Sequence, residues 1–167
     1  MASVYFLQLD GIEGQASDKA HDKWLELISF SHGGTQNVSI QRSGDVAGRG
    51  QFLPLTFVHA VDKASPKLQL YCMNGSKIEK AVLQYCRVIG GAQTPVYEVT
   101  LENVRVAKTL VKTIETGSGG TNDPFTQQPV EEVDLVAGKI TWKVTPIKPD
   151  GSKDGAIEAA YDQIANA

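Results

Sequence analysis

The sequence has few of the residues and segments that mark metal, redox or membrane proteins. It contains two cysteines, Cys72 and Cys86, which stand 14 residues apart without a CxxC or CxxH context. This spacing argues against a zinc site or a redox motif, and both cysteines are interpreted as small buried hydrophobic residues. Residues 1–9 hold an apolar run of only about five residues with no Lys or Arg before it, too short for a membrane span and atypical of a secretory signal. We therefore expect a protein that is made in the cytoplasm without a signal peptide and does not insert into a membrane.

The chain also lacks an excess of positive charge. Lys and Arg number 16 against 19 Asp and Glu, which gives a formal net charge of −3 at pH 7. A nucleic acid or an anionic membrane surface is therefore not expected as a partner. With 167 residues and 41% hydrophobic content, the chain is long enough to bury about 70% of its unfolded surface. We predict one globular domain, residues 1–167, with no internal repeat and no domain linker.

No segment carries a complete motif for nucleotide binding or nucleophilic catalysis. The glycines in residues 44–50 lack the Gly-Lys-Ser/Thr ending of a phosphate-binding loop, and those in residues 117–122 lack the last glycine of a dinucleotide-binding fingerprint. No nucleophile elbow is present. Both glycine-rich segments are interpreted as loops, and no cofactor is expected.

Histidines and paired acids do not indicate a site either. The three histidines are far apart in the sequence and share no helix or strand face, so a metal site is not expected. Glu131 and Glu132 are adjacent on a predicted strand and therefore point to opposite faces, which excludes a general acid and base acting on one substrate. We interpret both as solvated charges at a rim and predict a protein that is not an enzyme. The histidines are His21, His32 and His59.

One segment has a complete set of helix signals. Asp62 and Ser65 can cap the start of a helix, and Pro66 suits its first turn, where the missing N–H costs nothing. Gly75 provides a left-handed end. These signals predict a short α-helix at about Ser65–Asn74, which must gain stability by packing one face on the rest of the protein. That face would carry Leu68, Tyr71 and Cys72.

Most of the remaining sequence favours β-strands. The alternation of apolar and polar residues is cleanest at residues 140–145, where Ile140, Trp142 and Val144 alternate with threonine and lysine. Residues 95–116 could form one bent strand pair or one long arm. The predicted strands are residues 4–9, 24–31, 38–42, 54–61, 78–88, 95–106, 107–116, 130–136 and 140–145, the last two flanking residues 137–138.

Glycine-rich and polar stretches are interpreted as connections. Residues 33–34 interrupt a strand, residues 43–51 form an exposed mobile loop, and residues 117–123 form a flexible hairpin tip. From about residue 149 the chain is predicted to be a partly flexible tail, weakly helical at residues 156–164.

The strand predicted at residues 24–31 would have one bulky face and one face that tapers to Ser29 and Ser31. Two interpretations of Ser31 are open. It is either a surface serine at a strand end or a small polar group that lines a concave, solvated surface.

The segment Asp62-Lys63-Ala64-Ser65-Pro66-Lys67-Leu68, followed by Cys72 and Gly75, resembles the haemolysin-coregulated protein (Hcp) family, the tube subunits of type VI secretion systems. The resemblance covers nearly the whole chain, and the Asp-Lys-x-Ser-Pro-x-Leu element is its most specific part. The least similar parts are residues 42–52, residues 117–128 and the tail. Other matching blocks are Gly14, Ser17-Asp18, His21, residues 30–33, 81–87, 97–106 and 130–142.

The resemblance implies a mainly β fold, in which two antiparallel sheets form a closed or nearly closed β-barrel or sandwich with the helix on its flank. It also implies that six copies close into a ring and that rings stack into a tube expelled to the extracellular space or a target cell. The pore would carry and shield small effector proteins, with Ser29 and Ser31 as candidate lumen contacts. Expected partners are further copies of the chain, the spike and sheath of the secretion system, and the effectors. Candidate ring-stacking residues in the glycine-rich loops are Arg42, Asp45, Arg49, Gly117 and Gly120.

Two other classes stay open as alternatives. A monomeric β-sandwich that binds a small ligand or carbohydrate would place exposed aromatic residues near one set of loops, whereas most aromatic residues here lie in predicted strands. A hydrolase on a β scaffold would need a polar constellation that the sequence does not indicate. The mass in solution separates these from the first class, because a monomer of 18.0 kDa at high concentration is incompatible with a ring.

Overall fold

The computed structural model describes residues 4–41, 44–113 and 128–167. Within them the chain forms ten strands and one helix, so the predicted mainly β fold is confirmed. The elements in chain order are β1 (Tyr5–Leu9), β2 (Leu25–Glu26), β3 (Ser29–Thr35), β4 (Val38–Gln41), β5 (Gly44–Ala47), β6 (Gln51–Ala60), α1 (Ser65–Asn74), β7 (Lys77–Ile89), β8 (Ala92–Lys112), β9 (Val130–Val144) and β10 (Ile157–Asp162).

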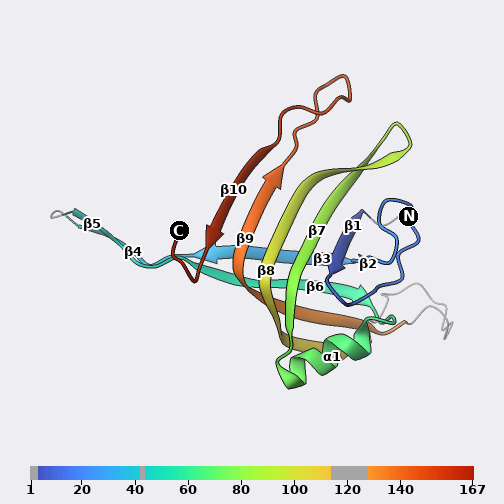
Figure 1. The fold of residues 1–167 in the computed structure, drawn as a ribbon. Helices are drawn as coiled ribbons and strands as arrows, with labels where there is room; N and C mark the ends of the chain where they lie inside the picture. Colours follow the sequence, from blue (N-terminus) through green and yellow to red (C-terminus); the bar gives the residue numbers. More distant parts are fainter. Residues whose placement is uncertain (1–3, 42–43, 114–127) are drawn as a thin grey trace, which may run out of the picture.

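Eight strands form one antiparallel sheet that curls strongly into a half-barrel (Figure 1). The strand order is β2-β1-β7-β8-β9-β6-β3, and β10 pairs with β9. The curled sheet has two layers, one with β3 and β6 and the other with β1 and β10. In β9, residues 130–135 pair with β6 and residues 139–144 pair with β10, so this bent strand runs through both layers. β8 is likewise one continuous strand of 21 residues, which decides between the two possibilities that the sequence left open.

A left-handed residue lies at the bend of the sheet. Asn103 in β8 has a φ of 57°, and Gly138 lies opposite it in β9. A Cβ on Gly138 would come within 2.9 Å of Ile164 Cδ1 and 3.1 Å of Asn103 Nδ2, so a larger residue here would have to displace these side-chain ends. β9 runs through this point without a break, and the predicted division into two strands at residues 137–138 is wrong.

The two ends of the sheet are joined where the chain passes from β2 to β3. The Leu27 N–H donates to the Tyr5 carbonyl in β1 at 2.9 Å, and the next N–H, of Ile28, donates to the Val58 carbonyl in β6 at 2.8 Å. Because β1 and β6 belong to different layers, one strand cannot pair with both along its length. The single strand predicted at residues 24–31 is therefore two short strands with a break at residues 27–28.

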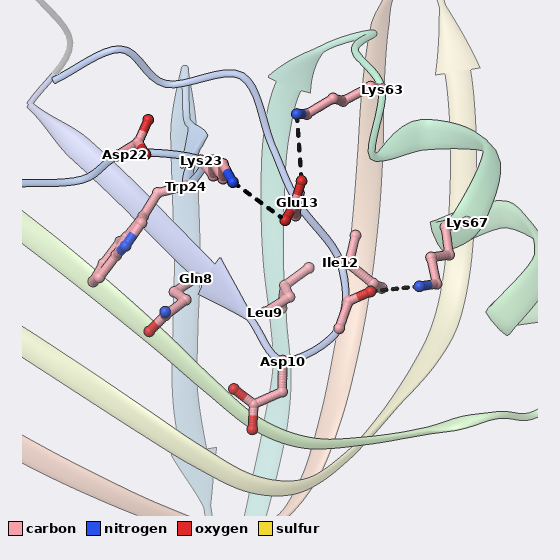
Figure 2. A pocket seen from close by; sticks show the side chains of 11 residues that line it. Gln8, Leu9, Asp10, Ile12, Glu13, Asp22, Lys23, Trp24, Lys63 and Lys67 are labelled. Atoms are coloured by element: carbon pink, nitrogen blue, oxygen red, sulfur yellow. Dashed lines mark hydrogen bonds and ion pairs between the residues drawn. The ribbon is translucent and has the colours of Figure 1, made fainter.

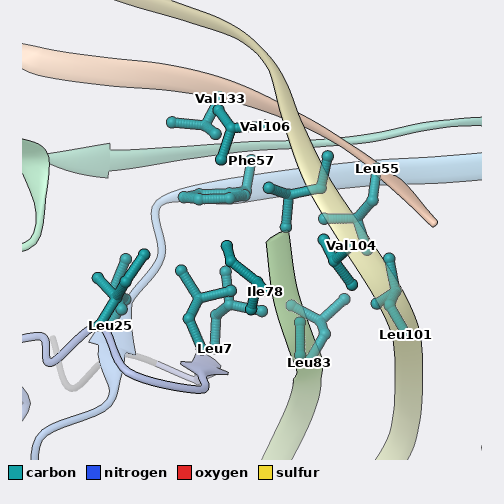
Figure 3. Packing of buried hydrophobic residues seen from close by; sticks show 14 of the residues in the cluster. Leu7, Leu25, Leu55, Phe57, Ile78, Leu83, Leu101, Val104, Val106 and Val133 are labelled. Atoms are coloured by element: carbon teal, nitrogen blue, oxygen red, sulfur yellow. The ribbon is translucent and has the colours of Figure 1, made fainter. Parts of the chain in front are cut away.

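The core fills the space between the layers. Side chains from β1, β6, β7, β8 and β9 meet there, as Figure 3 shows for Leu7, Phe57 and Leu83, each with at most 1% of its surface exposed. Burying a side chain of this size contributes about 1.5–3 kcal/mol. A second, smaller cluster lies on the outer side of β1 and β7 and comprises Phe6, Ala16, Cys86 and the partly buried Trp24.

The helix has the predicted bounds, but Ala64 stands at its N-cap without a side-chain cap. The Asp62 Oδ1 atom accepts a hydrogen bond from the Ala64 N–H at 2.8 Å, and the Ser65 hydroxyl accepts one from the Asp62 N–H at 3.1 Å. Gly75 ends the helix with a φ of 69°. Leu68 is fully buried, while Tyr71 and Cys72 pack against the core only partly buried, so the interpretation of both cysteines as buried holds for Cys86 alone. Both thiols are free.

Two predicted connections and one predicted helix are strands. Residues 33–34 lie inside β3, and residues 44–47 form β5, which pairs with β4 in a hairpin that projects from the barrel (Figure 1). The weak helix predicted at residues 156–164 is instead β10. It pairs with the part of β9 that extends beyond β6, and this strand pairing outweighs a weak helix propensity. The predicted hairpin tip at residues 117–123 lies outside the described residues.

Candidate functional site

Ser29 and Ser31 lie on the outward face of β3. They stand opposite Val58 and Thr56 of β6, and both are exposed, whereas Phe30 between them packs against the core. The alternation of a strand places the two serines on one side, as the sequence predicts. Their contact with a passenger protein stays a prediction.

The pair of strands β4 and β5, Val38–Gln41 and Gly44–Ala47, is called the arm from here on. Val38 and Ile40 are 60% and 83% exposed on it, and Asp45 lies opposite Ile40. A hairpin of this length is only marginally stable in water by itself. Because Val38 and Ile40 are exposed, the arm presents an apolar surface that suits contact with another polypeptide.

Of the candidate stacking residues, only Asp45 and Arg49 lie in the described structure, so the proposed stacking surface stays a prediction. Arg49, at the base of the arm, donates hydrogen bonds to the Gln163 and Ile164 carbonyls, so it fastens the C-terminal turn within its own chain. Three of the candidates, Arg42, Gly117 and Gly120, lie outside the described residues.

A cavity of about 660 Å³ lies between the end of β1 and the start of α1 (Figure 2). Glu13 lies between Lys23 and Lys63, with N–O distances of 3.8 and 3.6 Å, and Lys67 donates to the Gly11 carbonyl. The lining balances three lysines with three carboxylates. Exposed pairs at such distances contribute less than about 1 kcal/mol each, so this cavity favours neither an anion nor a cation strongly.

Cys86, His21 and Asp18 form the arrangement most similar to a catalytic triad. The Cys86 Sγ atom lies 3.7 Å from His21 Nε2, and His21 Nδ1 lies 2.6 Å from Asp18 Oδ2. However, Gln84 Oε1 lies 2.7 Å from the same Nε2, and its amide nitrogen donates to Glu98, which fixes the amide orientation.

The nearest partner of His21 Nε2 is therefore the Gln84 amide oxygen at 2.7 Å, not the Cys86 thiol at 3.7 Å. Burial raises the pKa of Cys86 to about 11, helped by the negative charges of Asp18 and Glu98. With the thiol fully buried as well, these residues hold residues 10–24 against the sheet rather than providing a nucleophile. The sequence gives no signal for this grouping, because its members come from segments more than 60 residues apart.

His59 and Glu131 form a fully buried ion pair. Their strands pair at this position, and His59 Nε2 lies 2.8 Å from Glu131 Oε1. The other Glu131 oxygen accepts a hydrogen bond from Gln69 of α1 at 3.2 Å, and His59 Nδ1 lies 3.5 Å from Asp62 Oδ2. The prediction of Glu131 as a solvated rim charge is wrong, because the sheet register places it inside, against a histidine that could not be assigned to it from sequence.

The pair makes stability depend on pH. Burial lowers the pKa of His59, but hydrogen bonds to Asp62 and Glu131 and their negative charges outweigh it and raise the pKa to about 9. A histidine whose folded pKa exceeds its unfolded value stabilises the protein fully below pH 6.5 and loses that contribution as the pH rises through about 9. We expect a loss of about 3 kcal/mol in the free energy of unfolding over this window.

Urea unfolding of the wild type and of His59→Gln between pH 6.5 and 10 measures this effect. The difference between the two proteins should shrink with rising pH, while titration of lysines affects both alike. A difference that stays constant across the series contradicts the assignment.

Within residues 4–41, 44–113 and 128–167, no group of three or more His, Cys, Asp or Glu side chains is placed to hold a metal ion. No helix among these residues is long and apolar enough to span a membrane.

These features define the class of the protein: a small β half-barrel with one flanking helix, whose exposed arm and strand faces suit contacts with other polypeptides. The family model for the type VI secretion system effector Hcp matches residues 6–144, and the chain belongs to the Hcp family. Hcp proteins are structural proteins secreted by type VI systems. The resemblance that the sequence indicates is therefore confirmed.

Individual relatives agree with this family. Protein hcp1 of Pseudomonas aeruginosa is 30% identical over 156 residues, covering 93% of this chain and 91% of its own. The crystal structure of Hcp1 from Salmonella typhimurium has a TM-score of 0.74 at 26% identity, covering 99% and 98% of the two chains. A further structure of a type six secretion system protein has a TM-score of 0.85 at 22% identity over 99% of both chains, a likeness of fold.

Proposed function

We propose that the chain is the subunit of a type VI secretion tube, in which six copies close into a ring and rings stack. The tube is assembled in the cytoplasm, contacts the spike and sheath, and is expelled to the extracellular space or a target cell. Its pore carries small effector proteins. The observation that carries this proposal is the arm, which exposes apolar side chains far from the core.

An open sheet edge supports the same proposal. In the described chain, β10 pairs only with β9, so one side of this strand is open. Open strand edges and exposed apolar side chains favour association with another chain. Because the arm and the open edge are different surfaces, the contact between copies would be heterologous, and such contacts close into rings when the rotation allows.

Sedimentation over a wide dilution series tests the ring. We expect a species of six times the 18.0-kDa chain. Ile40→Asp should shift the population toward single chains by placing a charge in the contact, whereas Ile40→Val should assemble as the wild type does. A wild-type protein that stays monomeric at every concentration overturns the proposal.

The pore surface has its own test. Ser31→Gln should leave the ring assembled and reduce the amount of effector that copurifies with it, because a longer side chain projects from an exposed strand face. Unchanged effector recovery would remove Ser31 from the contact.

The alternative of a monomeric carbohydrate-binding module has a weaker basis. Phe52, Trp142 and Tyr161 line a cavity of about 390 Å³, but Phe52 meets the other two rings edge to face, at 74° and 87°. This arrangement does not form a flat stacked platform for a sugar. The sedimentation experiment distinguishes this alternative as well.

A further inference from the structure

A further cavity, of about 360 Å³, lies where β3 passes near β1, β7 and β8. Its volume lies within the range of pockets that bind small ligands or single bulky side chains. Ile28, at its edge, is 52% exposed. The lining consists of Tyr5, Ile28, Ser29, Phe30, Tyr85 and Tyr97.

The aromatic wall of this cavity is held in place by its own contacts. The Tyr5 ring meets Phe30 edge to face at 5.4 Å and Tyr85 at 5.6 Å, measured between centroids. Tyr97 Oη lies 2.7 Å from His32 Nε2, and the two rings stack at 5.8 Å. Burial lowers the pKa of His32 and so favours the neutral ring, whose free nitrogen can accept a hydrogen bond from the Tyr97 hydroxyl. A wall that is already ordered costs little conformational entropy when a ligand binds.

The lining selects for a neutral, apolar group. Four of the six lining residues are aromatic and none carries a charge. A lysine or arginine side chain could stack on the rings, but it would leave water without meeting a carboxylate in the lining, which is unfavourable. A tryptophan, phenylalanine or leucine side chain incurs no such cost.

The neighbouring strand selects for an extended polypeptide. In the described chain, β3 pairs with β6 on one side only. An open strand edge beside a side-chain pocket is the arrangement by which proteins bind extended peptides, where backbone hydrogen bonds provide affinity and the pocket provides specificity.

We propose that this cavity binds one bulky apolar side chain of an extended segment in the protein that the tube carries. The inference rests on the proposed function, because Ser29 lines the cavity and lies on the strand face proposed to contact the passenger. The surface then recognises a neutral apolar side chain flanked by residues able to extend along β3.

Labelled synthetic peptides provide the test. The probes are capped threonine hexapeptides with one central tryptophan, alanine or arginine, and fluorescence polarisation measures their binding to the full chain. We expect the tryptophan peptide to bind at least about tenfold more tightly than the other two. Ser29→Trp fills the mouth of the cavity and Tyr85→Ala removes one wall, so each should weaken binding of the tryptophan peptide by about tenfold. Val88→Trp, on β7 outside the lining, should leave this binding unchanged.

Three results would overturn the inference. These are equal or absent binding of the three peptides, unchanged binding to Ser29→Trp, and loss of wild-type assembly in Ser29→Trp but not in Val88→Trp. The last would show that a second copy of the chain closes the cavity. If the wild type is monomeric and the tryptophan peptide binds as expected, the peptide site stands and the tube proposal fails, so the two are tested separately.

Discussion

Replacing Glu131 with alanine is expected to lower the free energy of unfolding by about 3–5 kcal/mol, as is typical when one partner of a buried ion pair is removed. Glu131 and His59 are both fully buried, and the carboxylate also accepts the Gln69 hydrogen bond from α1. Without it, the His59 cation loses its closest counter-charge and α1 loses a polar contact with β9. Urea unfolding at pH 7, with circular dichroism as the readout, measures the loss.

Glu132 provides the matched control. It is the next residue, its side chain is 24% exposed, and it meets Lys108 and Lys112 only at 3.7 and 3.8 Å. Glu132→Ala should cost less than about 1 kcal/mol. Equal losses at the two positions would show that the burial of Glu131 is not what makes it important.

A double replacement separates charge from packing. In His59→Leu/Glu131→Leu no buried charge is left unpaired, and such replacements of whole pairs are often nearly neutral. We expect the double variant to be more stable than Glu131→Ala. If it is less stable, the network contributes through its specific hydrogen bonds, with Gln69 as the first candidate.

The helix and the strand-rich composition could be predicted because their signals are local. The helix has the predicted bounds and Gly75 ends it with a left-handed φ, but Ala64 is the N-cap and the predicted capping by Asp62 and Ser65 is wrong, since both accept from N–H groups that precede the helix. Residues 140–144 of the predicted alternating strand likewise lie in β9, although Val144, predicted on the buried face, is exposed. Such signals need no knowledge of what the rest of the chain does.

The features that sequence reasoning missed depend on long-range pairing. β10 is a strand because β9 extends beyond β6, and Glu131 is buried because the register sets it opposite His59. The aromatic cavity likewise assembles residues from β1, β3, β7 and β8. None of these relations has a signature within one segment, and the exposed serines of β3 were predictable only because a strand alternates.

Gly14→Ala is expected to cost about 3 kcal/mol, because the new methyl group meets backbone rather than a movable side chain. A Cβ on Gly14 would overlap the Trp24 carbonyl oxygen and lie 2.7 Å from the Leu25 nitrogen. The Gly14 N–H also donates to the Lys23 carbonyl at 2.8 Å, so moving the chain aside breaks this bond. The segment would lift from the sheet and expose the small cluster around Phe6 that it covers.

Gly155→Ala is the control for this prediction, since a Cβ there meets nothing within 4 Å and should change stability by less than about 0.5 kcal/mol. Urea unfolding of both variants gives the comparison, and solvent access to the Cys86 thiol reports on the segment directly. Because Cys86 is fully buried beneath it, Gly14→Ala should speed the reaction of this thiol in the native state, whereas the half-buried Cys72 should react at an unchanged rate. A destabilised variant in which Cys86 stays as protected as in the wild type would place the strain elsewhere than between residues 14 and 24.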